Sequence, residues 1–465
     1  MSSKKLGLFD SVLLVSGSMI GSGIFLVSAD MTRQLGSAPW VMMAWLLAGV
    51  ITLLAALHFG ELASMMPGSG GQFNFISRIY GRKIGFVYGW TVFSVIQTGV
   101  IAAVAMAFSK HFWLIYDRYF VTDYVLLDHS IGTPVVALLS VWVLTGINVI
   151  GVQETKWVQR IFTLTKFLAL GALIMGGIYF AIQNGGELIR NFGSTHESSW
   201  VSKSLVNNQW EYLSSMGFML AFASAMVGSL FSSDAWQGIT FMGSEIKDSF
   251  KTLPKALFWG TLLVTIVYCL ANLAYFSVLS FEDVAHADSD RVGVAAVGKL
   301  ISSNGSFWSA EILMALLILI STFGCNNGLI LAGSRLYKSM ADQGLFFKIA
   351  SRTNKKELPS NALILQAIWA SVLCLSGTYG QLLSYCTFAS LLFYIITVAG
   401  VIKLRNNEPT AERPYKVWFY PYSTYLYLTL AGFVAVGILF SQFTIAITGI
   451  GIVLLGWPIY RFFGR

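Results

Sequence analysis

Long stretches without a charged residue alternate with short charged stretches along the whole chain. The uninterrupted windows lie at 11–29, 34–60, 84–109, 130–153, 256–281, 312–334, 358–402 and 417–460. A bilayer core about 30 Å thick requires about 20 apolar residues in a helix. Six windows therefore predict one membrane span each, and the two longest predict two spans each.

Two further segments are apolar around a single inner charge. Residues 157–186 enclose Lys166, and residues 212–244 enclose Asp234. The two double windows divide at turn residues, Gly377-Thr378-Tyr379-Gly380 and Ser441-Gln442-Phe443. The pattern predicts an all-α integral membrane protein with 12 transmembrane helices and both termini on one side.

Composition excludes several other classes of protein. Of the 465 residues, 55% are hydrophobic and 11% are charged, whereas globular domains carry about 25% charged residues. A cytosolic enzyme, a nucleic-acid-binding protein and a disordered scaffold are thereby excluded, and the lipid bilayer is the expected surrounding. The cysteines all fall within spans and the histidines are scattered, so we expect no disulfide framework, metal site or cofactor.

Positive charge fixes the expected orientation. With the N-terminus inside, 22 of the 30 Lys and Arg residues lie in cytoplasmic segments and 7 in external loops, leaving Lys166 inside a span. This asymmetry follows the positive-inside rule. We expect a multi-pass protein of the cell (inner) membrane with both termini cytoplasmic. The apolar stretch after Lys5 is too long for a cleavable signal peptide, so the first span is expected to stay.

The first span is interrupted by glycine. Gly17, Gly21 and Gly23 fall within seven residues, and each costs a helix about 1 kcal/mol relative to Ala. Unwound backbone survives in a bilayer only beside protein or a water-filled cavity. The alternative is that these small residues serve close helix packing.

The sixth span carries a matching interruption, a run of polar residues from Gly228 to Gly238. Spans 1 and 6 occupy the same place in two five-span halves, and a matched pair of broken spans is typical of transporters built from inverted repeats. The expected organisation is a first repeat at 1–186, an external loop at 187–211, a second repeat at 212–403, and spans 11–12 with the C-terminus at 404–465.

Broken helix ends suggest a chemistry. The N–H groups of a half-helix beginning at Gly21–Gly23 suit a carboxylate. Carbonyls freed near Phe231–Ser233 suit an ammonium group, so together the ends fit a zwitterion of amino-acid size. Phe231 and Trp236 flank the second break and are expected to close the pocket.

The sequence resembles the amino acid–polyamine–organocation transporter family, and most closely its prokaryotic relatives of the L-type amino-acid transporter light chains. The similarity covers nearly the whole chain through four motifs, at Met19–Phe25, Gly60–Gly71, Phe231–Pro254 and Phe323–Leu345. It implies a LeuT-like fold of two five-helix inverted repeats, with helices 1 and 6 broken. It also implies a substrate site formed by Ile20, Gly21, Ser22, Gly23, Phe231, Ser232, Ser233, Trp236, Ser321 and Cys325, with Phe231 as an aromatic gate.

Lys166 is the stronger functional candidate of the two charged residues inside the membrane. Charged residues at that depth are costly and mark functional sites. One interpretation is a lysine that snorkels to the inner interface. The other is a built-in cation bonded to the unwound part of span 1, in the place where sodium-coupled relatives keep an ion. The resemblance supports the second, and burial would also allow the lysine to exchange protons.

The remaining polar candidates have two interpretations each. Asp234 either caps the second half-helix of span 6 or contacts substrate. Glu61 and Glu245 lie near inner helix ends and form either gate-stabilising ion pairs or ordinary solvated salt bridges. Gln97 and Thr98 either line the site or bond a neighbouring helix.

The sequence therefore favours a secondary active transporter of small neutral L-amino acids that works by alternating access, through sodium-independent exchange. A proton-coupled symporter of the same fold is the alternative, followed by an amino-acid sensor or channel. An enzyme would need convergent catalytic groups within the spans, which the sequence does not offer.

Light-chain relatives in animals are linked to a glycoprotein through a cysteine in the loop after span 3. The corresponding loop, about 110–130, has no cysteine, so no disulfide-linked heavy subunit is expected.

Overall fold

The fold is taken from a computed structural model, which describes residues 6–120, 129–151, 155–193, 200–302, 307–377 and 379–463. Its α-helices are α1 (Leu8–Met19), α2 (Gly23–Leu35), α3 (Ala38–Met65), α4 (Gln72–Tyr80), α5 (Arg82–Thr91), α6 (Gln97–Phe120), α7 (His129–Ile150), α8 (Thr155–Asn184), α9 (Gly186–Phe192), α10 (Ser215–Ser232), α11 (Gly238–Phe241), α12 (Ser249–Val278), α13 (Phe281–Ala285), α14 (Val292–Ser302), α15 (Phe307–Asp342), α16 (Ser360–Ser376), α17 (Tyr379–Asn407), α18 (Tyr422–Ser441) and α19 (Phe443–Phe463). The shorter elements are a π-helical turn η1 (Val92–Ile96), three 3-10 turns η2 (Gly243–Glu245), η3 (Asp288–Asp290) and η4 (Lys348–Ser351), and two strands, β1 (Lys203–Val206) and β2 (Gln209–Tyr212).

The helices are long and apolar enough to make this a multi-pass membrane protein. Within the described residues, ten of them can each cross a bilayer, and α1 with α2 makes an eleventh if the bent pair counts as one span. The sequence predicts its ninth span where α16 lies, and that apolar helix has only 17 residues. The total of 12 spans stays a prediction.

Both predicted interruptions are present. Helix α1 ends at Met19 and α2 begins at Gly23, with a bend of 42° between them. Helix α10 ends at Ser232, and the chain is then irregular up to the short helix α11, with Ala235 at a φ of 71°. The glycines and small polar residues of these runs favour such ends, because they stabilise a continuous helix poorly.

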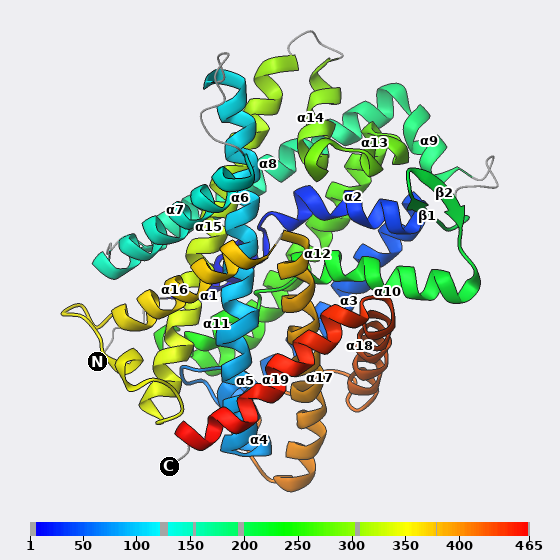
Figure 1. The fold of residues 1–465 in the computed structure, drawn as a ribbon. Helices are drawn as coiled ribbons and strands as arrows, with labels where there is room; N and C mark the ends of the chain where they lie inside the picture. The colour runs from blue at the N-terminus through cyan, green and yellow to red at the C-terminus, as the bar shows by residue number, and fades with distance from the viewer. Residues whose placement is uncertain are drawn as a thin grey trace.

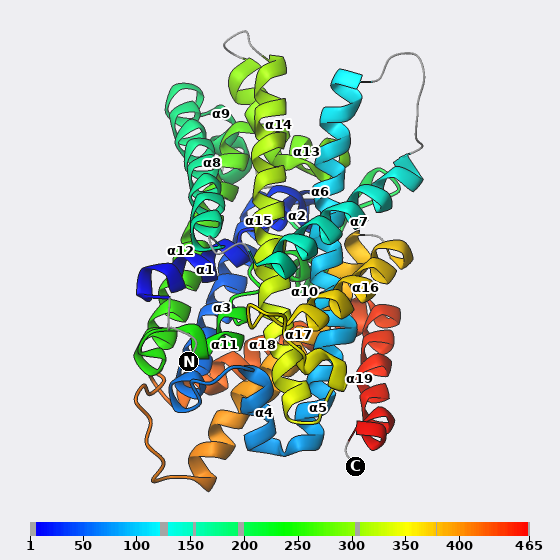
Figure 2. The same cartoon turned by 90° about the vertical axis from the view of Figure 1, so that its left-hand side faces the viewer.

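The helices form one elongated bundle (Figures 1 and 2). Helix α12 packs along α3 and α1, α15 packs along α6, and α10 packs along α2. Helices α9, α13 and α14 lie at the upper end of both views, whereas α4 lies at the lower end. The N and C labels both stand in the lower half of each view.

The structure corrects two details. The predicted external loop at 187–211 contains helix α9 and an antiparallel β-hairpin, in which Lys203 pairs with Tyr212 and Val206 with Gln209. The first part of the loop expected at 110–130 is helical instead, because α6 continues to Phe120 and includes His111, whereas residues 121–128 lie outside the described residues. The turn residue Thr378, the basic pair Lys4-Lys5 and His196 lie outside the described residues.

Candidate functional site

The ammonium group of Lys166 lies at the break in the first span. Its Nζ atom donates to the carbonyl oxygens of Gly17 and Ile20, each at 2.7 Å. The side chain is 1% exposed, so the snorkelling interpretation is wrong. Helix α8 therefore supplies a fixed positive charge to the end of α1. A role in coupling stays a prediction.

The end of α1 is held by side chains from three other helices. A helix leaves its last four carbonyls without an intrahelical partner. Here the Ser18 carbonyl accepts from the Cys325 thiol at 3.1 Å, and the Met19 carbonyl accepts from the Tyr268 hydroxyl at 2.9 Å. With Lys166, side chains of α8, α12 and α15 thus cover consecutive carbonyls from Gly17 to Ile20.

The start of α2 has the opposite character. Among the described residues, the N–H groups of Gly21, Ser22 and Gly23 find no hydrogen-bond acceptor. These donors stand at the positive end of the helix dipole, which suits an anion such as a carboxylate. The Ser22 hydroxyl lies 3.5 Å from that of Tyr379 on α17.

The two breaks are in contact. Tyr268 has one hydroxyl hydrogen, and its oxygen lies 2.9 Å from the Met19 carbonyl and 3.0 Å from the Ser232 carbonyl. The Phe231 carbonyl accepts from the N–H of Asp234 at 3.1 Å. One tyrosine of α12 therefore bridges the end of α1 and the end of α10.

The two aromatic residues that flank the second break have different neighbours. The Phe231 ring meets the Tyr379 ring edge to face, with centroids 6.2 Å apart. Trp236 is buried against Phe59 and Tyr394, at centroid distances of 4.8 and 5.3 Å. Their proposed gating roles thus concern two separate aromatic contacts.

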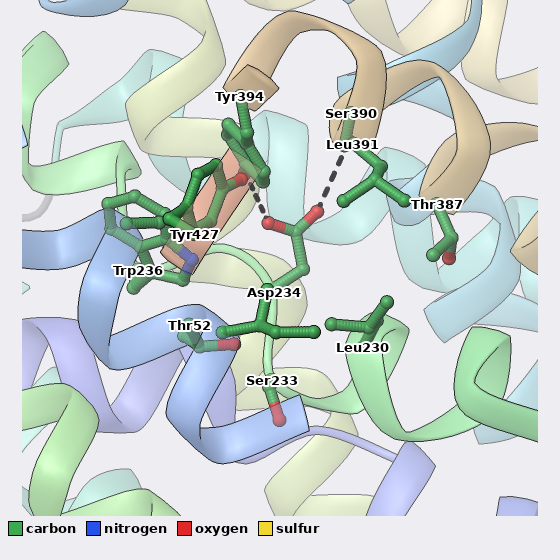
Figure 3. Close-up of a pocket in the computed structure, with 12 residues that line it drawn as sticks. Thr52, Leu230, Ser233, Asp234, Trp236, Thr387, Ser390, Leu391, Tyr394 and Tyr427 are labelled. Carbon is green, nitrogen blue, oxygen red and sulfur yellow. Dashed lines mark hydrogen bonds between the residues drawn. The ribbon is translucent and has the colours of Figure 1, made fainter. Parts of the chain in front are cut away.

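Asp234 does not cap the second half-helix. The residue before α11 is Gln237, which makes no side-chain capping bond. The Asp234 carboxylate instead accepts from the hydroxyl of Tyr394 at 2.5 Å and from that of Ser390 at 3.4 Å (Figure 3). The capping prediction is wrong because α17 packs against the break and its hydroxyls bind the carboxylate, whereas α11 begins only at Gly238.

The remaining candidates on α15 and α6 lie at helix interfaces. Cys325 faces the end of α1, whereas Ser321, one turn away, is buried with no hydrogen-bond partner among the described residues. Gln97 donates to the Leu329 carbonyl of α15 at 2.8 Å. The Thr98 hydroxyl donates to the Phe93 carbonyl at 2.6 Å, within the same helical segment. Gln97 therefore joins two helices, and Thr98 bonds a carbonyl of the preceding π-helical turn.

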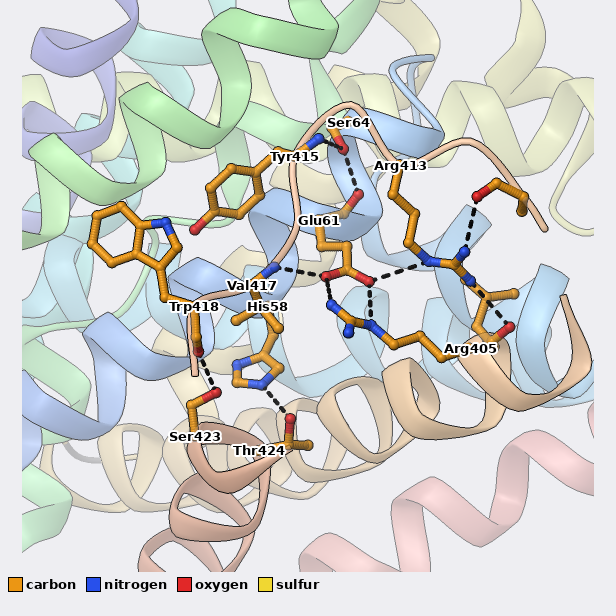
Figure 4. Close-up of polar contacts among 12 residues, drawn as sticks. His58, Glu61, Ser64, Arg405, Arg413, Tyr415, Val417, Trp418, Ser423 and Thr424 are labelled. Atoms are coloured by element: carbon orange, nitrogen blue, oxygen red, sulfur yellow. Dashed lines mark hydrogen bonds and ion pairs between the residues drawn. The ribbon is translucent and has the colours of Figure 1, made fainter. Parts of the chain in front are cut away.

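Glu61 is the centre of a buried ion-pair network (Figure 4). Its carboxylate accepts from Arg405 at 2.9 and 2.5 Å and from the Val417 N–H at 2.8 Å, and it lies 3.5 Å from Arg413. Glu61 is 1% exposed, so the solvated salt bridge is excluded. The network fastens the chain between α17 and α18 to the end of α3. Burial raises the pKa of Tyr415 in that connection to about 12, helped by the Glu61 charge, so this phenol stays neutral.

Glu245 forms the second predicted ion pair. Its carboxylate lies 2.8 Å from Arg335 of α15. The same residue accepts through its carbonyl from the Leu6 N–H at 3.2 Å, and Lys247 donates back to the Leu6 carbonyl at 2.9 Å. The chain ahead of α1 is thus bound to the segment that follows α11, and a gating role stays a prediction.

Sequence reasoning did not find the tyrosines of the site. Three tyrosines contact polar groups at the breaks: Tyr268 a backbone carbonyl, Tyr379 the Ser22 hydroxyl, and Tyr394 the Asp234 carboxylate. The chain contains 19 tyrosines, and nothing in the local sequence separates these three from those that face lipid. Only the packing of α12 and α17 against the breaks selects them.

Comparison with known proteins identifies the family of this chain. The model of the amino acid permease family matches residues 6–459. The mouse protein "Large neutral amino acids transporter small subunit 2" is 29% identical over 459 residues, which cover 98% of this chain and 80% of the relative. The mouse "b(0,+)-type amino acid transporter 1" is 26% identical over 415 residues, covering 89% of this chain and 78% of the relative. The chain is therefore a member of the amino acid permease family, within the amino acid–polyamine–organocation transporters, and is a transporter and not an enzyme.

Proposed function

We propose that this protein is a secondary active transporter of small neutral L-amino acids that works by alternating access, as a sodium-independent exchanger. The substrate carboxylate binds the N–H groups of Gly21, Ser22 and Gly23 at the start of α2. Its ammonium group binds carbonyls between Phe231 and Ser233. The membership in a family of amino acid permeases supports the substrate class.

The observation that carries the proposal is the contact of Lys166 with the break. A sodium-coupled mechanism needs a cation that arrives and leaves at each cycle. Here the carbonyls of Gly17 and Ile20 are already bonded by an ammonium group that belongs to the protein. A resident cation removes the need for sodium, so the substrate itself drives the return step by exchange.

The proposed architecture is a LeuT-like pair of inverted repeats. Helices α1–α2 and α10–α11 are the two broken members, and they meet through Tyr268. The repeats then run over 1–186 and 212–403, with 404–465 as the peripheral part. We place both termini in the cytoplasm of a cell with this protein in its inner membrane, on the strength of the positive-charge asymmetry.

The gates of this mechanism are proposed at both ends of the broken spans. Phe231 and Trp236 cover the substrate pocket, and Ser321 and Cys325 line it from α15. Glu61 and Glu245 hold the side nearer the termini closed through Arg405 and Arg335. Both ion pairs connect elements that lie far apart in the sequence, which is what a reversible closure requires.

Counterflow in proteoliposomes tests the function. Vesicles loaded with unlabelled amino acid are diluted into labelled amino acid without any ion gradient. Transient accumulation of label is expected, because alternating access couples the exit of one molecule to the entry of another. Equilibration without overshoot would mean a channel, and binding without uptake would mean a sensor.

A substrate panel and an ion comparison complete the test. The panel includes small and large neutral amino acids, because the mouse relative is named for large neutral ones. Uptake is then compared in sodium and in choline buffers. Equal rates are expected, and dependence on a sodium gradient would contradict the exchanger with a built-in cation.

A further inference from the structure

A small cavity lies beside Asp234, away from the contacts of Lys166. The volume open to the centre of a water molecule is about 20 Å³, which is room for about one water. Five elements line it: α3, the end of α10, the second break, α17 and α18 (Figure 3). Its hydroxyl-bearing lining residues are Thr52, Ser233, Thr387, Ser390, Tyr394 and Tyr427.

In the part of the chain that the structure describes, Asp234 has hydrogen-bond donors but no cationic partner. Its carboxylate accepts from the hydroxyls of Tyr394 and Ser390. Among the described residues, no Lys, Arg or His forms an ion pair with it. The side chain is 8% exposed. A buried carboxylate without a cationic partner is unstable and is neutralised by uptake of a proton.

The surrounding elements supply no compensating charge. The titratable side chains close to Asp234 are Tyr88 on α5, Cys386 and Tyr394 on α17, and Tyr427 on α18. All four are neutral near pH 7. Helix α10 carries no ionisable residue, and α3 carries His58 and Glu61 farther along, of which Glu61 is paired with Arg405.

The helix ends near Asp234 also supply no compensating positive charge. Asp234 follows the C-terminal end of α10 by two residues, and the negative end of a helix dipole disfavours a carboxylate. Helix α11, whose positive end lies ahead, has four residues and contributes little. The local backbone therefore places partial negative charge, and no compensating positive charge, next to Asp234.

Tyr427 gives the cavity a second, independent polar group. Its hydroxyl is fully buried and has no hydrogen-bond partner among the described residues. A water molecule in the cavity would satisfy this hydroxyl and carry a proton to or from Asp234. The Tyr427 ring also lies 6.3 Å from the His58 ring, which is bonded to Thr424 beside the Glu61 network (Figure 4).

We propose that Asp234 and its cavity form a proton-binding site whose occupancy is required for the closed form of the second break. When the break packs against α17 and α18, a hydronium ion from the solvent transfers one proton to a carboxylate oxygen of Asp234. One O–H bond of the hydronium breaks, one O–H bond forms on the carboxyl group, and a neutral water molecule is left. The same proton returns to water when the break opens, and no other bond is made or broken. The proposal rests on the proposed function, because it assigns this step to the transport cycle.

Counterflow at equal internal and external pH tests the site. The wild-type protein and Asp234→Asn are compared from about pH 5 to about pH 8, each normalised to its own maximal rate. Above its midpoint the wild-type rate should fall roughly tenfold per pH unit, as for a single protonation site, whereas the Asp234→Asn rate should not change. Asp248→Asn, which alters an exposed carboxyl, is the matched control and should keep the wild-type profile.

A second variant tests the geometry. Tyr394→Phe removes the hydroxyl that donates to the ionised carboxylate, so the midpoint should move to higher pH. Tyr394→Phe with an unchanged midpoint would overturn the proposal. So would an Asp234→Asn protein with the wild-type pH profile, or wild-type transport that depends on sodium and not on pH.

Infrared spectroscopy separates the site from the function. In folded wild-type protein, a band from a protonated buried carboxyl should be present and should be absent from Asp234→Asn, with thermal unfolding as the check on folding. An identical band in both proteins, or none in either, would overturn the proton site even if transport is normal. Absence of counterflow at every pH would overturn the proposed function, while the infrared band would still decide the proton site.

Discussion

Gly23, the first residue of α2, lies directly against Ser232, the last residue of α10. A Cβ atom built at Gly23 would stand 2.1 Å from the Ser232 Oγ and 2.8 Å from its Cβ. The Gly23 backbone therefore packs directly against the Ser232 side chain, with no space for a side chain on Gly23. This contact is a stronger reason for glycine at position 23 than helix propensity is.

The first prediction concerns this contact. Gly23→Ala should lower counterflow at least tenfold and lower the melting temperature, because the added methyl group pushes the two breaks apart and overpacking costs about 1–3 kcal/mol. Counterflow and thermal unfolding of the purified protein in detergent measure both effects.

Two variants give this experiment its controls. Gly171→Ala on α8 adds a methyl group into open space and should not reduce either quantity. Gly23→Ala combined with Ser232→Gly should regain part of the lost stability. If the double variant is no more stable than Gly23→Ala, the contact is not the cause.

Lys166→Ala should reduce counterflow at least tenfold. The change removes two hydrogen bonds from a charged donor, each worth about 1.5–3 kcal/mol, and leaves the carbonyls of Gly17 and Ile20 without that partner. Lys255→Ala, on the exposed side of α12, is the matched control. Sodium-driven uptake that is intact in Lys166→Ala would show that the lysine is not a built-in cation.

Tyr268→Phe should slow counterflow about fivefold and destabilise the protein, because an unmade buried hydrogen bond costs about 1–3 kcal/mol. The hydroxyl bridges the carbonyls of Met19 and Ser232, so its loss frees both breaks. Tyr275→Phe on the same helix removes a buried hydroxyl without a partner among the described residues and should be nearly neutral. Equal effects of the two substitutions would refute the bridging role.

Glu61→Gln should lower the melting temperature strongly. Loss of one partner from a buried ion pair costs about 3–5 kcal/mol, because Arg405 and Arg413 keep their charges. The matched control is Glu408→Gln, which breaks the exposed pair with Arg78 and should cost about 0–1 kcal/mol. Similar losses in both variants would show that the buried network contributes no more than a surface pair.

Much of the site follows from local sequence. Gly21 and Gly23 predict an interrupted helix wherever they are placed in a bilayer, and the polar run around Ser232 predicts a second interruption. Lys166 is conspicuous because a charge in an apolar span has few explanations. These features are visible along one segment at a time, and the structure contains them.

Asp234 shows where such reasoning fails. Its position just before a half-helix predicts a cap, but its partners Tyr394 and Ser390 come from a helix more than 150 residues away. No local signal distinguishes a carboxylate that will cap its own helix from one that a distant helix will bind. The same holds for Glu61, whose arginine partners lie more than 340 residues later.

The sequence by itself determined the membrane class, the approximate spans, both helix breaks and the family, because each depends on hydrophobicity or backbone preference within a short segment. The tertiary structure alone decided that the two breaks touch, that Lys166 donates to carbonyls of the first, and that Asp234 is buried with no cationic partner among the described residues. Those facts depend on which helices pack together. Packing brings side chains from distant segments within hydrogen-bond distance, and a local pattern does not encode it.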